Sequence, residues 1–302
     1  MPDWYERITQ ETPPDILAEH DLRYALVASL IAESALWCDL GCGNGIGAAT
    51  ALAGRRPGGR VVLVDSDAEA IAVARGELGV EDAVSLTADL ASPDGLAHVR
   101  EHVAGDDGTV ITCFEVIEHL ESFVPLVRAL SELVEGGGTT VALSVPNDAF
   151  WNVRNPYHRA AWGVGAMAEL QSVLPAGHLV LHQVPLSGSA ALPTDGEERF
   201  DVQVQARTVG EPTHFIVAMG AQAERVKPGA QVAQVDVVAH RSWERQREAH
   251  LAVAEARLAV AEATIAKQSK WFEEWRAYIH DLERQLGQPL SGGGEDESPP
   301  SS

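Results

Sequence analysis

The chain has 302 residues, 45% hydrophobic and 22% charged, which is ordinary usage for a globular protein. A chain of this length buries a sizeable core, which excludes a wholly disordered protein, a collagen-like rod and a small disulfide scaffold. Acidic residues outnumber basic ones by 44 to 22, and the net charge of −22 argues against broad nucleic-acid binding, because phosphate contacts need a basic face.

The three cysteines and the N-terminal sequence bear on the compartment. Cys38, Cys42 and Cys113 are odd in number and form no C-x-x-C pair, so we expect reduced, intracellular thiols. The first residues lack a basic segment followed by an apolar one, and the apolar run at 24–32 is too short to span a bilayer. The sequence therefore predicts a cytoplasmic protein without a membrane span.

After an N-terminal helical segment (1–35), short β-rich runs alternate with helical patterns. Several of the runs are apolar on both faces, which is typical of parallel strands covered by helices. The predicted strands are 36–40, 61–65, 84–87, 110–114 and 140–145, and the helices between them are 45–52, 68–78, 94–103 and 122–134. This alternation predicts a doubly wound, Rossmann-like α/β fold with a mostly parallel sheet.

A glycine-rich turn follows the first predicted strand. Gly41, Gly43 and Gly45 let the backbone turn sharply and approach a ligand, and the helix after them offers free N–H groups. A dinucleotide-binding turn would place its third glycine at Ile46. The observed pattern, which begins at Asp39, is instead Asp-x-Gly-x-Gly-x-Gly.

Two further acids follow the next two strands. Asp65 ends the second strand, where a carboxylate accepts hydrogen bonds from both hydroxyls of a ribose. Asp89 and Leu90 follow the third strand, where an acid and a backbone N–H would meet the edge of an adenine.

In these three motifs the chain, over about residues 30–220, resembles the class I S-adenosylmethionine-dependent methyltransferases. The resemblance implies a seven-stranded sheet and a loop of glycines around the cofactor, with Asp65 at its ribose and with Asp89 and Leu90 at its adenine. It also implies that Asp39 fixes the loop or a water near the methionine amine. A NAD-type fold or a glycine turn without a ligand is the alternative.

A polar cluster follows the fourth strand. Glu115, Glu118 and His119 lie within five residues, and His158 lies in a loop after the fifth strand. The ends of parallel strands face the ligand crevice, so these groups are expected where the methyl acceptor binds.

This stretch resembles the ubiquinone-biosynthesis O-methyltransferases and the small-RNA 2′-O-methyltransferases. By resemblance to the latter, Glu115, Glu118, His119 and His158 would hold a divalent metal ion. Three alternatives remain open: a general base at His119 or His158 without a metal, helix capping and loop orientation by Glu118 and His119, and contact of Glu115 with the cofactor's amino group.

The function predicted from these residues is O-methylation of a small metabolite or a glycan, with S-adenosylmethionine as cofactor. Two alternatives are RNA 2′-O-methylation, for which Arg154 and Arg159 are the nearby basic candidates, and a non-catalytic scaffold of this fold that assembles through a coiled coil. The retained glycines and acids argue against the scaffold.

The C-terminal third is predicted in several parts. A helix at 164–174 and strands at 179–184 and 213–219 would complete the methyltransferase domain (36–225), with an insertion at 185–212 and a short strand at 202–206 within it. After a linker (226–240), residues 241–287 form a predicted coiled coil, and 288–302 a disordered acidic tail.

The coiled-coil prediction comes from a seven-residue spacing. The first series is Leu251, Leu258, Ile265, Phe272, Ile279 and Leu286, and the second is Ala254, Ala261, Gln268, Trp275 and Leu282. The pattern favours self-association and a left-handed supercoil, and the small alanines and the polar Gln268 leave the number and orientation of the helices open.

Overall fold

The computed structural model describes residues 8–9, 12, 14–52, 55–104, 107–151, 155, 157–159, 161–186, 211–230 and 237–287. The chain divides into two compact units, residues 1–243 and 244–302. The predicted strand at 202–206, most of the insertion at 185–212 and the predicted acidic tail lie outside the described residues.

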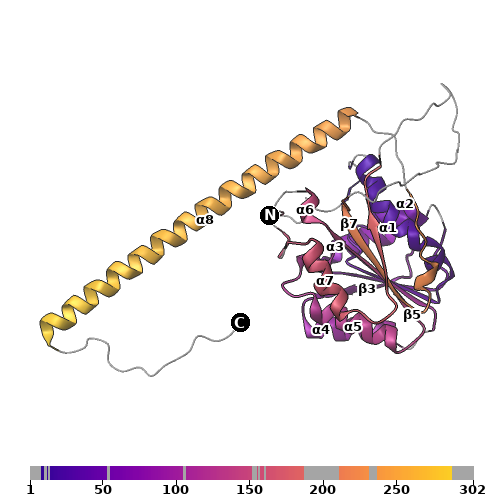
Figure 1. The fold of residues 1–302 in the computed structure, drawn as a ribbon, viewed down its shortest axis with the longest axis horizontal. Coiled ribbons are helices and arrows are strands. Elements are labelled where there is room, and N and C mark those ends of the chain that lie inside the picture. Colours follow the sequence, from indigo (N-terminus) through magenta and orange to yellow (C-terminus); the bar gives the residue numbers. More distant parts are fainter. Residues whose placement is uncertain are drawn as a thin grey trace. The chain divides into compact units, whose positions relative to one another are not determined.

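The first unit is built on one seven-stranded sheet (Figure 1). Its strands are β1 (Leu36–Leu40), β2 (Arg60–Asp65), β3 (Val84–Thr87), β4 (Thr109–Phe114), β5 (Thr139–Pro146), β6 (Leu179–Gln183) and β7 (His214–Gly220). They lie in the order β3-β2-β1-β4-β5-β7-β6, and only β7 runs antiparallel to its neighbours. The predicted Rossmann-like, mostly parallel sheet is confirmed.

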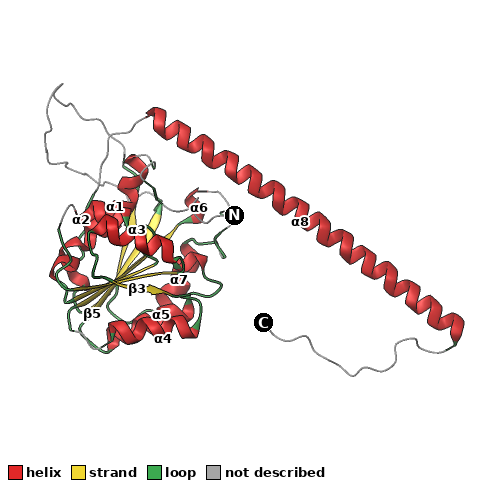
Figure 2. Ribbon diagram, turned by 180° about the vertical axis from the view of Figure 1, so that it is seen from behind, coloured by secondary structure: helices red, strands yellow, loops and turns green. Residues whose placement is uncertain are grey.

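Helices cover both faces of this sheet (Figure 2). Side chains of α1 (Pro14–Glu33), α2 (Ile46–Leu52) and α3 (Ala68–Leu78) pack on one face. Those of α4 (Pro93–Val103), α5 (Val124–Glu135) and α7 (Val164–Val173) pack on the other. Because successive strand residues point to opposite faces, the central strands β1, β2, β4 and β5 contribute to both hydrophobic clusters, which explains their apolar sequences.

Helix ends in this unit coincide with capping residues. Asp67 accepts hydrogen bonds from the backbone N–H groups of Glu69 and Ala70 at the start of α3, and Gly79, in the left-handed conformation, ends the helix. Ser92 caps α4 in the same way. Three shorter elements, η2 (Ile117–His119), α6 (Asp148–Trp151) and η3 (Ala223–Arg225), connect the strands and helices.

The helix α8 (Val237–Leu286) has 50 residues and begins within the segment predicted as a linker. From Glu244 on it forms most of the described part of the C-terminal unit. Its described side chains are mostly exposed. None of the helices in the described part of the chain is long and apolar enough to cross a membrane.

Candidate active site

The glycine-rich turn connects β1 to α2 and has the backbone that its sequence predicts. Gly41, Gly43 and Gly45 have φ angles of 71°, 51° and 76°, a region that favours glycine. A Cβ at Gly41 would collide with Val116, and one at Gly45 would lie 2.9 Å from Ala74. A Cβ at Gly43 would meet nothing within 4 Å, so at this position the backbone borders open space.

That open space belongs to a cavity of about 560 Å³ at the carboxyl ends of β1, β2 and β4. This volume lies within the range of small-molecule sites in proteins. The cavity brings together the glycine turn, the acids after β2 and β3, part of α1 and the loop after β4; the predicted site residues on its wall are Gly41, Gly43, Gly45, Asp65, Asp89, Leu90, Glu115 and His119.

The two acids beyond the turn are both fixed by backbone N–H groups. Asp65 accepts hydrogen bonds from the N–H of Gly43, at 2.9 Å, and from that of Asp67, at 3.0 Å. Asp89 accepts one from the N–H of Ala91, at 2.9 Å, and is exposed on the cavity wall. Asp65 thus links the glycine turn to the end of β2 while it borders the cavity.

Asp39 lies behind the turn, fully buried and away from the cavity wall. Its carboxylate accepts hydrogen bonds from the hydroxyls of Tyr24, at 3.0 Å, and Thr112, at 2.6 Å. The indole N–H of Trp37 in turn donates to Thr112. Burial raises the pKa of Asp39 to about 7, although both hydroxyls oppose the shift. In this arrangement Asp39 joins α1 to the sheet directly beneath the turn.

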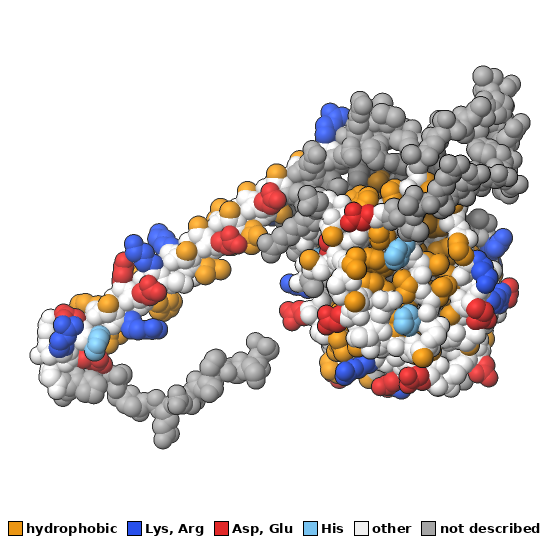
Figure 3. All heavy atoms as spheres, in the orientation of Figure 1, with side chains coloured by type: hydrophobic (Ala, Val, Ile, Leu, Met, Phe, Trp, Pro, Cys, Tyr) orange, Lys and Arg blue, Asp and Glu red, His pale blue; other side chains and the backbone are white. Residues whose placement is uncertain are grey.

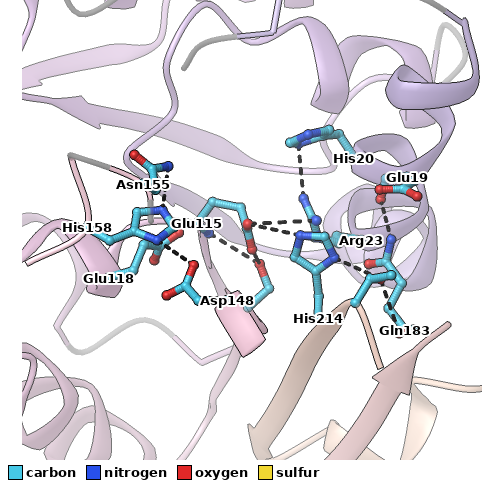
Figure 4. A network of polar contacts seen from close by, with 12 residues as sticks. Glu19, His20, Arg23, Glu115, Glu118, Asp148, Asn155, His158, Gln183 and His214 are labelled. Atoms are coloured by element: carbon cyan, nitrogen blue, oxygen red, sulfur yellow. Dashed lines mark hydrogen bonds and ion pairs between the residues drawn. The ribbon is translucent and has the colours of Figure 1, made fainter. Parts of the chain in front are cut away.

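Glu115 lies at the centre of a buried polar network (Figure 4). Its carboxylate accepts a hydrogen bond from the Ser144 hydroxyl, at 2.7 Å, and lies 3.3 Å from Nε2 of His214 and 3.8 Å from the Arg23 guanidinium. Burial opposes ionisation of Glu115, but Arg23, His214 and Ser144 together hold its pKa well below the usual value.

Arg23 and the histidines around it were not predicted as site residues. The Arg23 side chain is 1% exposed, borders the cavity and donates a hydrogen bond to Nδ1 of His20, at 3.0 Å. Burial is the largest cause that lowers the pKa of His20, to about 3, and the charge of Arg23 is the next. The same two causes lower the pKa of His214. The one sequence signal for Arg23 is that it is the single arginine or lysine of its helix and directly precedes an apolar run.

Nε and one terminal nitrogen of Arg23 are buried without a hydrogen-bond partner among the described residues. The terminal nitrogen lies 3.8 Å from the Glu115 carboxylate, which meets the charge of the guanidinium but not its donors, so these donors favour a further acceptor at the cavity.

A second polar group lies near the other end of the cavity. Glu118, His119 and His158 each offer an atom that lies within 4.8 Å of the other two, and Glu118 is buried. Nδ1 of His119 donates to the Tyr157 carbonyl, at 3.3 Å, which leaves Nε2 with a lone pair. Nδ1 of His158 lies 2.8 Å from the Asp148 carboxylate. This contact orients the His158 ring, as the Tyr157 carbonyl orients that of His119.

The four residues implied as metal ligands are thus separated into two groups. Glu118, His119 and His158 converge. The Glu115 carboxylate is instead directed to Arg23 and His214 (Figure 4). The wall of the cavity near His119 also includes Tyr157 and Arg159, and Arg154 lies outside the described residues.

The fold is a doubly wound α/β sheet with a cavity at the carboxyl ends of its strands, where ligands bind in this class of fold. A methyltransferase-domain family matches residues 17–281, and the chain belongs to this family. Its domain is that of the class I methyltransferases, which use S-adenosylmethionine.

Individual relatives are more distant. A ubiquinone biosynthesis O-methyltransferase from Sodalis glossinidius (strain morsitans) is 37% identical over 102 residues, a match that spans 33% of this chain and 37% of that protein. Among solved structures, the small RNA methyltransferase HEN1 has 19% identity and a TM-score of 0.45, over 76% of this chain and 29% of the other. The N-terminal domain of EvdMO1 with SAH bound has 16% identity and a TM-score of 0.40, over 68% and 81%.

The cavity fits this cofactor on chemical grounds. The open backbone at Gly43 admits a close ligand, and the exposed Asp89 and the fixed Asp65 offer acceptors to an adenine and a ribose. The unsatisfied donors of Arg23 suit the carboxylate of a methionine moiety.

Proposed function

We propose that the protein methylates a hydroxyl group of a small metabolite or a glycan. The observation that carries this proposal is the convergence of Glu118, His119 and His158 near one end of the cofactor cavity. A hydroxyl acceptor must lose a proton when it is methylated, and an imidazole that borders the cavity, as that of His119 does, suits this need.

In this proposal Gly43, Asp65, Asp89 and Leu90 hold the cofactor, and Arg23 binds its carboxylate. When bound, S-adenosylmethionine supplies a methyl group activated by its sulfonium. The protein then aligns the acceptor oxygen with this methyl group, and such orientation is worth roughly 7–11 kcal/mol of the barrier in favourable cases.

His119 is the proposed general base, because it borders the cavity while its Nδ1–H is held by the Tyr157 carbonyl. His158 and Asp148 form a pair behind it, with the rings of His119 and His158 5.3 Å apart. In this arrangement Nε2 of His119 takes the proton of the acceptor hydroxyl.

The same three side chains also fit a divalent ion, since they combine one carboxylate with two imidazoles. Glu118, His119 and His158 would hold the ion, and its charge would lower the pKa of the acceptor hydroxyl. Elemental analysis of the purified protein separates the two roles: the metal role requires a bound ion that Glu118→Gln removes, and the general-base role requires activity after chelation.

Transfer of labelled methyl from S-adenosylmethionine into fractionated extract of the source cells tests the proposal. We expect label in the small-molecule or glycan fraction, lost in Asp65→Ala and reduced at least about 100-fold in His119→Ala. His98→Ala, on an exposed surface of α4, is the matched control and should retain activity. Label in RNA, or equal activity in His119→Ala, would contradict the proposal.

A further inference from the structure

The helix α8 carries a stripe of exposed apolar side chains (Figure 3). Leu258, Ile265, Phe272, Trp275 and Leu286 are between 48% and 62% exposed. Their spacing in sevens places them along one gently winding face. A helix of this length that exposes so much apolar surface is expected to bury it against a partner.

The two halves of this stripe differ in size. Its N-terminal half combines Leu258 with the small Ala254 and Ala261. Its C-terminal half presents the larger side chains of Phe272, Trp275 and Ile279. The ring of Trp271 stacks on that of Trp275, with centroids 6.1 Å apart and an interplanar angle of 22°, and widens the stripe there. The stripe is therefore narrow at one end and bulky at the other.

We propose that α8 pairs with the α8 of a second copy in antiparallel orientation, with the two-fold axis between Ala266 and Lys267. In this register each bulky residue meets a small or aliphatic one. The facing pairs are Ala254 with Ile279, Leu258 with Trp275, Ala261 with Phe272 and Ile265 with Gln268, each from opposite copies.

The alternative parallel pair would place alanines against alanines and Trp275 against its own copy. Helices that meet through small side chains approach more closely than helices that meet through aromatic ones. In a parallel pair the two helix axes would therefore move apart toward their C-terminal ends and leave voids between the side chains. In the antiparallel pair the distance between the axes stays the same along the helices.

Two contacts beside the stripe fit the antiparallel register; a parallel pair would instead bring Arg257 to Glu262, so the choice of orientation rests on the packing of large against small side chains. The antiparallel register places Glu255 opposite Arg276 of the second copy on one flank, where the two charges attract. On the other flank Arg257 faces the Tyr278 ring of the second copy, a cation–π arrangement. By two-fold symmetry each contact occurs twice.

Light scattering on the full chain during gel filtration tests the pairing. We expect a dimer at about 10 µM, and at least 100-fold weaker dimerisation in Ile265→Glu, because this change buries an unpaired charge. Ala263→Glu, on the opposite side of the helix, is the matched control and should remain a dimer. A monomeric wild-type chain, or equal effects of both variants, would overturn the proposal.

Disulfide formation tests the orientation. In the antiparallel pair, the two copies of residue 254 are separated by roughly 37 Å along the axis, so Ala254→Cys alone should form no disulfide dimer. When Ala254→Cys chains are mixed with Ile279→Cys chains of a different length, a disulfide should join one chain of each variant. The native cysteines are buried, and the parent chain measures their background. A dimer of Ala254→Cys with itself, or a lack of the mixed dimer, would overturn the antiparallel register.

Discussion

Glu115 has a φ angle of 55° and is the one residue other than glycine with a positive φ among those that the structure describes. A side chain in this region costs about 1 kcal/mol or more relative to glycine. The contacts of its carboxylate with Ser144, His214 and Arg23 offset this cost. The strained backbone turns the carboxylate into the network rather than toward Glu118.

This strain predicts an unusual order of stability. Glu115→Ala and Glu115→Gly lose the same carboxylate contacts, but only alanine retains the backbone strain. We therefore expect the free energy of unfolding of Glu115→Gly to exceed that of Glu115→Ala by about 1 kcal/mol, measured by urea denaturation.

The control for this comparison is Glu132, an exposed residue within α5. At this position Glu132→Ala should be the more stable variant, because glycine in a helix interior destabilises a protein by about 1 kcal/mol relative to alanine. If alanine were the more stable substitution at both positions, strain at Glu115 would not be the cause.

At the scale of the elements, the strands 36–40 and 84–87 and the helix 68–78 were predicted with the bounds that the structure has. These segments are apolar runs or periodic patterns with clear ends, such as the cap at Asp67 and the glycine at position 79. The glycine turn and the acids after β2 and β3 were equally predictable, because they follow strands whose ends share one edge of the sheet.

The polar network around Glu115 was not predictable in the same way. Arg23 comes from α1, and His214 begins β7, which pairs antiparallel with β5 so that His214 faces Pro146. Only this pairing brings His214 to the end of the sheet where Glu115 lies. Arg23, Glu115 and His214 are far apart in the sequence, so no local spacing predicts that they meet. The direction of the Glu115 side chain depends on this contact.

The contact between α1 and β1 through Asp39 predicts a pH dependence of stability. The folded protein holds a proton on Asp39 up to about pH 7, whereas the unfolded chain releases it near the ordinary value of 3.8. Between these values the folded state binds more protons, so stability falls as the pH rises, by on the order of 1–4 kcal/mol.

Asp39→Asn isolates this contribution, because the amide keeps the shape of the side chain and does not titrate. Urea denaturation of both proteins between pH 4 and 8 should give stabilities whose difference changes steadily up to about pH 7 and then levels off. Parallel pH profiles of the two proteins would contradict the assignment of a raised pKa to Asp39.

At the scale of the whole molecule, the dominant electrostatic property is the net charge of −22. Such an excess destabilises the compact state through self-repulsion. Exposed ion pairs such as Arg100–Glu132, at 2.6 Å, oppose this repulsion, but each pair of this kind contributes little to stability. Repulsion should therefore outweigh these attractions at low ionic strength.

Added salt is accordingly expected to stabilise the protein. The screening length falls from roughly 30 Å at 0.01 M salt to about 10 Å at 0.1 M, which shields repulsion between distant acids more than attraction within a close pair. Tm should rise by several degrees between 0.01 and 0.3 M sodium chloride. Choline chloride, with a different cation, should give the same rise, because the effect depends on ionic strength. A fall of Tm in both salts would show that the ion pairs dominate, and a rise in sodium chloride alone would indicate specific cation binding.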